Sequence, residues 1–281
     1  MFNLISAKEL ALLKNKRECS IIDIRENEEY KKGHIADSVN ITDFFYYLSK
    51  SSPDGIEELK NLFQEVLNRN GIRNSDAVIL YEEEMDKKYG GSCRGAFIMK
   101  LLGHKEVYVL HGGYTAWLNA GQEVSVKETS PEKSYYNIHI DRTWFADYTE
   151  MLKAIENPDI FILDNRDRDE WIGISSSPYG EDYSPRKGRI PNAHWIEWYD
   201  FMEVKDGIPI FKSDDDIRKI AKQNGLNSGM EIIIYCFKGS RASNTLLALH
   251  KAGFGQAKVY FASWYEWAGK SELPVDDRVI S

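Results

Sequence analysis

The chain has 281 residues, of which 42% are hydrophobic and 28% charged, so it is long enough for two domains with a core each. Its 36 basic residues against 44 acidic ones give a formal net charge of −8, which argues against a surface devoted to nucleic acid. The apolar runs are short, such as residues 232–236, far below the roughly 20 residues that cross a bilayer, so we expect no membrane partner.

The N-terminal residues show no basic stretch followed by an apolar run, so a secretory signal is not indicated. The three cysteines are Cys19, Cys93 and Cys236, an odd number without the spacing of a disulfide framework. Free thiols fit a reducing compartment, and we therefore expect a cytoplasmic protein. Cys19 precedes a strand-like run and is expected to be an inert thiol at the edge of the core.

Four segments of the first half recur in the same order in the second half. The matched pairs are 21–30 with 162–171, 33–38 with 188–193, 78–81 with 232–235, and 107–110 with 258–261. This order predicts a duplicated domain. We expect a first domain over residues 1–124, a linker over 125–138 and a second domain over 139–281. An additional stretch at 175–187 of the second half is rich in Ser, Pro and Gly and predicts a surface loop.

Short β-branched runs alternate with helical patterns in each half. In the second half, strands are predicted over 160–163, 232–235 and 258–261, with helices over 214–224 and 243–252. Ser213 is a candidate N-cap, and Gly225 and Gly253 stand where helices end. The alternation predicts an α/β fold in both domains, each an open and mostly parallel sheet flanked by helices. In such sheets the ligand site lies beyond the carboxyl ends of the strands.

The strand at 78–81 ends in Glu82 and a long acidic loop, which we expect neither to cradle an anion nor to supply a nucleophile. Cys93 lies beyond that loop, near the predicted start of the next helix, and a structural role is expected for it. The first domain is therefore predicted to be non-catalytic.

The matching strand of the second half ends in Cys236, followed by Phe237, Lys238, Gly239, Ser240 and Arg241 and then a helical pattern. Backbone amides in such a loop can converge on one point, and the helix N-terminus adds partial positive charge there. Lys238 and Arg241 add full charges, which favour a nucleophilic thiolate at Cys236 and an anion bound to its sulfur. A buried, unreactive cysteine at a strand end is the alternative.

Asp23 and Asp164 each precede an arginine by two residues and are expected to brace loops at strand ends. Arg166 is predicted either to reach the active-site loop or to form a surface ion pair. The six histidines show no metal-ligand spacing and there is no Cys-x-x-Cys motif, so no metal site and no cofactor are expected.

The combined pattern resembles the tandem-domain rhodaneses, the sulfurtransferases of the thiosulfate and 3-mercaptopyruvate group. The similarity covers both halves and is carried by four motifs in the second: 163–171, 188–193, 235–243 and 264–267. It implies two rhodanese-like domains of which the second is catalytic. Cys236 would take a sulfane sulfur from thiosulfate or 3-mercaptopyruvate, become a persulfide, and pass the sulfur to cyanide or a thiol. A thiol-carrying protein is a further candidate acceptor.

Within this resemblance Lys238 matches the loop lysine of thiosulfate-preferring members. Phe237 departs from the family pattern because many members carry arginine there. Glu170 stands where some members place a substrate-binding arginine. The loop residues Phe237 to Arg241 are thus expected to bind substrate, with Asp164 and Arg166 in support.

Two other functions remain open from the residues alone. A cysteine-dependent phosphatase or arsenate reductase uses a related loop, but it places five residues between cysteine and arginine to wrap a tetrahedral anion. Here four residues separate Cys236 from Arg241. A non-catalytic binding module is the other alternative, which the intact cysteine disfavours.

Overall fold

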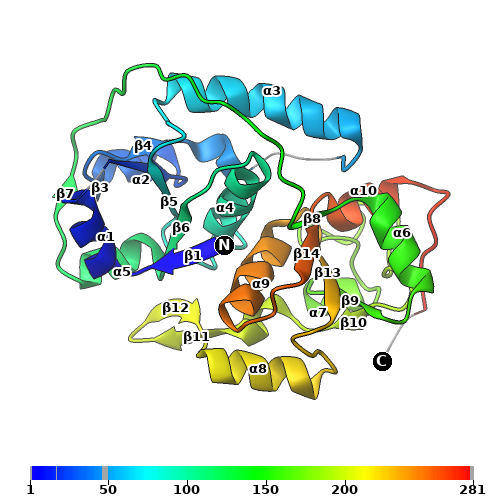
Figure 1. Ribbon diagram of the computed structural model, residues 1–281. Helices are drawn as coiled ribbons and strands as arrows, with labels where there is room; N and C mark the ends of the chain where they lie inside the picture. Colours follow the sequence, from blue (N-terminus) through cyan, green and yellow to red (C-terminus); the bar gives the residue numbers. More distant parts are fainter. Residues whose placement is uncertain (1, 17, 46–49, 279–281) are drawn as a thin grey trace. The chain divides into compact units, whose positions relative to one another are not determined.

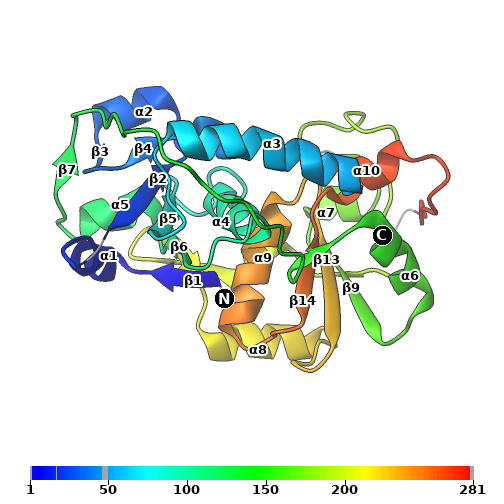
Figure 2. The same ribbon diagram turned by 45° about the horizontal axis from the view of Figure 1, so that its top comes forward.

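The computed structural model describes residues 2–16, 18–45 and 50–278, which form two compact units. The first unit comprises Met1–Tyr47, Glu57–Asp141 and Val204–Phe211. The second comprises Leu48–Ile56, Arg142–Glu203 and Lys212–Ser281. Each unit is therefore built mainly from one half of the chain and completed by a short segment from the other half. Figures 1 and 2 show the elements of both units.

A five-stranded parallel sheet forms the centre of the first unit, in the order β1-β6-β5-β2-β4. Its strands are β1 (Phe2–Ile5), β2 (Cys19–Asp23), β4 (Val39–Asn40), β5 (Ala77–Tyr81) and β6 (Val107–Leu110). Two short antiparallel strands, β3 (His34–Ile35) and β7 (Val124–Ser125), form a separate pair. The helices of this half of the chain are α1 (Ala7–Lys14), α2 (Asn27–Lys32), η1 (Thr42–Phe45), α3 (Pro53–Arg69), α4 (Gly91–Leu101) and α5 (Gly113–Asn119).

The second unit has the same sheet, in the order β10-β9-β13-β14-β8, again with all neighbours parallel. Its strands are β8 (Phe145–Ala146), β9 (Ile160–Asp164), β10 (His194–Trp195), β13 (Glu231–Tyr235) and β14 (Ala257–Tyr260). The remaining elements of this half are α6 (Tyr148–Glu156), α7 (Arg168–Trp171), η2 (Trp198–Phe201), β11 (Met202–Lys205), β12 (Ile208–Phe211), α8 (Asp214–Gln223), α9 (Ser240–Lys251) and α10 (Ser263–Gly269). The predicted duplication and α/β class are confirmed.

Helices cover both faces of the second sheet, which explains why its strands are apolar without alternation. One face of the sheet packs in a single buried cluster with Met151 of α6 and Trp264 of α10. The sheet contributes Ile162, Ile233 and Tyr235 to this cluster. In both views α9 lies on the other side of β13 and β14 from α6. This sandwich fixes the carboxyl end of β13, where the candidate cysteine stands.

The sequence-based boundaries are close to those observed. Ser213 is the N-cap of α8, accepting a hydrogen bond from the Asp216 amide, and Gly225 and Gly253 adopt positive φ angles just beyond α8 and α9. The prediction that the next helix starts at residue 243 is wrong, because α9 begins at Ser240. Gly239, with φ of +84°, turns the chain directly into the helix and makes Arg241 a helical residue.

Part of the predicted linker packs on the first unit. Tyr136 is fully buried, its hydroxyl lies 2.7 Å from Nδ1 of His104, and its backbone amide donates to the Asn68 side chain at 2.7 Å. The Ser134 amide donates to the Asn68 carbonyl at 2.9 Å. These hydrogen bonds explain why the first unit extends to Asp141.

A serine near the start of α3 is built into the second unit. The Ser51 hydroxyl donates to one carboxylate oxygen of Glu266 at 2.5 Å, and the Ser51 amide donates to the other at 2.9 Å. Tyr260 donates a further hydrogen bond to Glu266 at 2.9 Å. Ser51 is fully buried and Glu266 nearly so, and the three donors compensate the carboxylate for its lost hydration.

Candidate active site

Cys236 is the first residue after β13, and its side chain is 1% exposed. The Gly239 amide donates a hydrogen bond to its Sγ at 3.0 Å. Helix α9 starts one residue later, so the partial positive charge of its N-terminus lies beside the sulfur. The structure thus places the cysteine in the kind of loop that stabilises a thiolate or a sulfur-bound anion.

Gly239 is required at its position by both conformation and space. Its φ of +84° is unfavourable for residues with a side chain. A Cβ there would lie 2.5 Å from the carbonyl oxygen of Phe261 and 2.7 Å from its ring. The close approach of these two backbones keeps the loop tight around the sulfur.

The backbone of Cys236 is held by the turn that opens α10. Its amide donates to the Ser263 hydroxyl at 3.1 Å, and that hydroxyl donates to the Tyr260 carbonyl at 2.8 Å. The Trp264 amide in turn donates to the Cys236 carbonyl at 3.0 Å. Ser263 has φ of +57°, an uncommon conformation for a residue other than glycine. Ser263 could not be predicted from the sequence, since its left-handed conformation leaves no sequence signal.

Arg241 is 1% exposed and is paired with two carboxylates. It donates to both oxygens of Glu170, at 2.6 and 3.1 Å, and lies 2.8 Å from Asp167. Burial alone would lower the pKa of Arg241, but Glu170 and the anionic form of Cys236 outweigh it and raise that pKa well above its usual value. Arg241 is therefore charged and electrostatically coupled to the sulfur. Glu170 is thus the buried ion-pair partner of Arg241.

The other residues of the cysteine loop differ in their burial and in the chemical groups that they offer. Phe237 is buried, whereas Lys238 is half-buried at the outer side of the loop. Ser240 opens α9 and is 6% exposed, and its hydroxyl has no hydrogen-bond partner within the described part of the chain. Thus the loop offers an ammonium group, an amide directed at sulfur and a buried hydroxyl.

Asp164 and Arg166 form a fully buried ion pair at the end of β9, with Arg166 Nη2 2.7 Å from the carboxylate. The Tyr235 hydroxyl donates to Asp164 at 2.5 Å, and Arg166 also donates to the Gly188 carbonyl at 2.8 Å. Burial acts to lower the pKa of Arg166, but Asp164 outweighs it and raises that pKa. The expectation of a surface ion pair is wrong, because neither side chain reaches solvent.

The first unit has an equivalent buried ion pair at the end of β2, but no equivalent of Cys236. Arg25 lies 2.7 Å from Asp23 and donates to the Gly33 carbonyl at 2.7 Å. The hydroxyl of Tyr81 accepts the Ile35 amide at 3.2 Å, as that of Tyr235 accepts the Ile190 amide at 3.1 Å. Because the same bonds occur in the unit that has Glu82 in place of Cys236, the pair supports the strand ends in both units.

Glu82 occupies the place in the first unit that Cys236 holds in the second. Its carboxylate accepts the Ser92 amide at 2.8 Å, the Ser92 hydroxyl at 2.6 Å and the Lys88 amide at 3.2 Å. The amides of this loop are thus used by the loop's own carboxyl group, whose pKa is raised by burial. Cys93 lies in α4 as expected and is 1% exposed.

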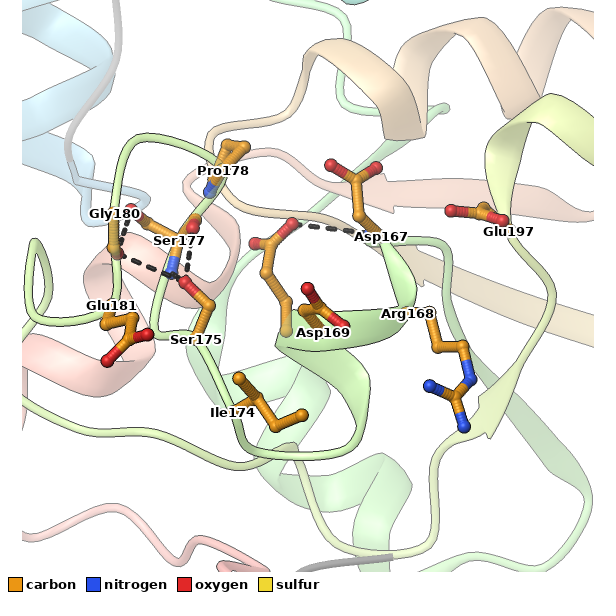
Figure 3. A pocket seen from close by; sticks show the side chains of 11 residues that line it. Asp167, Arg168, Asp169, Ile174, Ser175, Ser177, Pro178, Gly180, Glu181 and Glu197 are labelled. Atoms are coloured by element: carbon orange, nitrogen blue, oxygen red, sulfur yellow. Dashed lines mark hydrogen bonds between the residues drawn. The ribbon is translucent and has the colours of Figure 1, made fainter. Parts of the chain in front are cut away.

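An open pocket of about 470 Å³ adjoins α7 in the second unit (Figure 3). Carboxylates dominate its lining, and one of them is Glu170, the partner of Arg241. The others are Asp167, Asp169, Glu181 and Glu197, together with the single basic side chain Arg168. Burial, and then Asp167 and Asp200, raise the pKa of Glu197. The pocket is thus an acidic recess reached by the same carboxylates that neutralise Arg241.

In the described ranges 2–16, 18–45 and 50–278, no group of His, Cys, Asp and Glu side chains is arranged to hold a metal ion. Within the same ranges, no helix is both long and apolar enough to span a membrane.

The geometry defines a duplicated parallel α/β protein with one cysteine at the carboxyl edge of its second sheet. The family model of the rhodanese-like domain matches the chain twice, over residues 6–120 and 147–270. The chain belongs to the rhodanese-domain sulfurtransferase family.

Relatives that carry a thiosulfate sulfurtransferase name align with most of the chain. One from Mycobacterium tuberculosis is 30% identical over 263 residues, covering 89% of this chain and 88% of its own length. One from Corynebacterium glutamicum is 26% identical over 265 residues, covering 90% of this chain and 84% of its own length.

Solved structures of EanB are also similar. Its Y353A variant in complex with ergothioneine superimposes with a TM-score of 0.84 at 22% identity, covering 99% of this chain and 71% of that one. The anaerobic ergothioneine biosynthesis enzyme of Chlorobium limicola gives a TM-score of 0.82 at 24% identity. At such identities the likeness establishes the fold.

Proposed function

We propose that the protein is a thiosulfate sulfurtransferase that works through a persulfide on Cys236. The observation that carries this proposal is the Gly239 amide aimed at the Cys236 sulfur, 3.0 Å away, in a loop closed by the N-terminus of α9. These groups stabilise negative charge on sulfur before and after it takes up a second sulfur atom.

In the first half-reaction the Cys236 thiolate attacks the sulfane sulfur of thiosulfate. A new S–S bond forms, the old S–S bond of thiosulfate breaks, and sulfite leaves with its electron pair. The product is a persulfide whose outer sulfur is anionic or protonated. The loop amides and the N-terminus of α9 stabilise both the thiolate and the persulfide anion, so their contribution is electrostatic.

In the second half-reaction a nucleophilic acceptor attacks the outer sulfur of the persulfide. With cyanide the products are thiocyanate and the regenerated Cys236 thiolate. With a thiolate acceptor, small or carried by a protein, the acceptor becomes the persulfide. No cofactor takes part in this cycle, since each sulfur atom moves as a neutral atom between two nucleophiles.

Mass spectrometry tests the proposed intermediate. Incubation with thiosulfate should add one sulfur atom to the peptide that contains Cys236, and cyanide should remove it with formation of thiocyanate. Sulfur added to Cys93 instead would contradict the proposal. So would efficient, Cys236-dependent hydrolysis of aryl phosphates, which four residues between cysteine and arginine disfavour.

The preference for thiosulfate over 3-mercaptopyruvate rests on Lys238. This half-buried ammonium belongs to the loop and provides a point charge that attracts the dianionic thiosulfate more strongly than the monoanionic 3-mercaptopyruvate. Steady-state rates with each donor at a fixed acceptor concentration test the preference. A higher kcat/KM for 3-mercaptopyruvate would reverse the assignment of the donor while leaving the sulfur-transfer chemistry in place.

A further inference from the structure

Four aromatic rings surround the ammonium group of Lys238. Its Nζ lies 4.3 Å from the ring centre of Tyr265, 5.4 Å from those of Tyr183 and Phe237, and 6.0 Å from that of Tyr179. These distances are within the range of cation–π attraction. We call Tyr179, Tyr183, Phe237 and Tyr265 the aromatic box.

The rings also pack on one another around Phe237. Its ring centre lies 5.7 Å from that of Tyr179, 6.0 Å from that of Tyr183 and 5.8 Å from that of Tyr265, with interplanar angles between 64° and 82°. Such edge-to-face arrangements are favourable for aromatic rings. The box is therefore a packed cluster whose innermost member is the residue next to Cys236.

Three separate segments build the box. Tyr179 and Tyr183 come from the loop at 175–187, Phe237 from the cysteine loop, and Tyr265 from α10. The Tyr265 amide donates to the Phe237 carbonyl at 2.9 Å, which fixes these two segments to each other.

The loop at 175–187 is anchored near α10 by Arg186. Its guanidinium donates to four carbonyls around the end of that helix, those of Trp267, Ala268, Lys270 and Leu273, at 2.6 to 3.0 Å. Ser176 and Ser184 of the same loop are buried. A surface loop was expected here, and the loop is indeed irregular, but its two ends are fixed while Tyr179 and Tyr183 project to the surface, 50% and 56% exposed.

The two cationic side chains of the loop, Arg241 and Lys238, are held by different kinds of neighbour. Arg241 is paired with Glu170 and Asp167, so its charge is largely balanced where it lies. Aromatic rings hold a cation without cancelling its net charge, unlike a carboxylate. The rings of the box hold the ammonium of Lys238 beside the cysteine loop, where it faces an approaching anion.

We infer that Tyr179, Tyr183 and Tyr265 are positioning residues that act through Lys238 and set the preference for an anionic sulfur donor. This inference rests on the proposed function and adds to it the source of donor specificity. The loop at 175–187, which has no counterpart in the first half of the sequence, is the part of the chain that supplies two of these rings.

Alkylation of Cys236 tests the inference without sulfur transfer. Iodoacetate is anionic and iodoacetamide is its neutral analogue, and peptide mass spectrometry gives the rate of each reagent at Cys236. The double variant Tyr179→Leu/Tyr183→Leu should lower the iodoacetate-to-iodoacetamide rate ratio by about three- to tenfold. Tyr179→Phe/Tyr183→Phe keeps the rings and should keep the ratio. Tyr135→Leu, at a site that is 87% exposed, is the matched control.

A double-mutant cycle separates positioning from general damage. Lys238→Met should lower the same ratio, and adding the two leucine substitutions to Lys238→Met should change it no further. If the leucine variant slows both reagents equally, or lowers the ratio equally in the Lys238→Met background, the inference is overturned.

The steady-state test links the box to the donor. In the leucine variant the KM for thiosulfate should rise by about three- to tenfold. Discharge of the preformed persulfide by the neutral thiol dithiothreitol should keep the wild-type rate. An unchanged KM for thiosulfate overturns the inference, whereas a wild-type protein that forms no persulfide contradicts the proposed function instead.

Discussion

The loops that follow β5 and β13 are the same structural site with two different occupants. After β13 the Gly239 amide points at the sulfur of Cys236, and after β5 the Lys88 and Ser92 amides point at the carboxylate of Glu82. In both units the next helix begins after a glycine with a positive φ angle, Gly90 in one and Gly239 in the other. The strand-to-helix turn thus creates an anion site by itself, and the residue at the strand end decides its use.

The residue two positions after that glycine also differs between the two units. Ser92 donates its amide and its hydroxyl to Glu82, so the first site is filled from within. Arg241 stands there in the second unit, and its partner Glu170 comes from α7. A second difference lies at the start of the last helix, where Gly113 and Ser263 both have positive φ angles but only Ser263 offers a hydroxyl to the loop. The second unit therefore has a residue with a less favourable backbone conformation at this position, and its hydroxyl accepts a hydrogen bond from the Cys236 amide.

The largest effect is expected from removing the nucleophile. Cys236→Ser should lower the rate of sulfur transfer at least about a thousandfold, because a serine hydroxyl remains protonated and cannot carry a sulfane sulfur. The rate of thiocyanate formation from thiosulfate and cyanide measures it. Cys93→Ser, the control in the first unit, should keep most of the activity. Similar losses in both variants would mean that Cys236 has no special role.

Gly239→Ala should lower the free energy of unfolding by about 3 kcal/mol, since the new methyl group adds a clash with Phe261 to the strain of a positive φ angle. The variant Gly253→Ala separates the cost of the clash from the cost of the positive φ angle. Gly253 has φ of +96° but nothing within 4 Å of the added Cβ, so its loss should be about 1 kcal/mol. Urea unfolding of both variants measures the difference, and equal losses would show that the contact with Phe261 is unimportant.

Acid should destabilise the protein through His250 of α9. Burial lowers the pKa of His250 to about 4, from about 6.5 when exposed. The unfolded chain binds the proton more tightly, so this contribution is complete above pH 6.5 and is lost as the pH falls toward 4. The loss between pH 7.5 and pH 4.5 is about 2.5 kcal/mol.

The variant His250→Gln tests whether His250 causes this loss of stability at low pH. Glutamine keeps an N–H that can reach the Ala257 carbonyl, which lies 3.2 Å from Nε2 in the native protein, but it does not titrate. The fall in stability between pH 7.5 and pH 4.5 should shrink by about 2.5 kcal/mol in this variant. An identical pH dependence in variant and wild type would show that another group is responsible.

The smallest effect is expected from changing Glu82, the residue of the first unit that stands where Cys236 stands in the second. Glu82→Gln replaces a carboxyl group that accepts three hydrogen bonds through two oxygens with an amide that has one acceptor oxygen, and should lower the free energy of unfolding by about 1 kcal/mol. The rate of thiocyanate formation should stay within about twofold of wild type, because the cysteine loop belongs to the other unit. A large fall in activity without a fall in stability would give Glu82 a functional role.

Local patterns explain what the sequence could predict. The duplicated order of apolar runs predicted two equivalent sheets, and a buried strand followed by cysteine, glycine, two basic residues and a helix predicted the loop at Cys236. These signals are contiguous in the chain and need no knowledge of packing.

The partners of that loop come from distant segments and could not be predicted in the same way. Glu170 is 71 residues from Arg241. Tyr179 lies near Lys238 on a loop that Arg186 anchors to the end of α10. Arg166 shows the same limit, since nothing in its sequence context indicates complete burial. Conformation sets a further limit, because the left-handed backbone of Ser263 is enforced by the turn around it.

The bond between Ser51 and Glu266 has a consequence for the history of this duplication. These residues are 215 positions apart, and the buried carboxylate of Glu266 takes two of its hydrogen bonds from a serine that the first half encodes. A gene fragment that starts at residue 139 would leave Glu266 with only the hydrogen bond from Tyr260 of these three. The halves are repeats in shape but no longer interchangeable modules, so recombination that exchanges one second half for another would have to carry the segment around Ser51 with it.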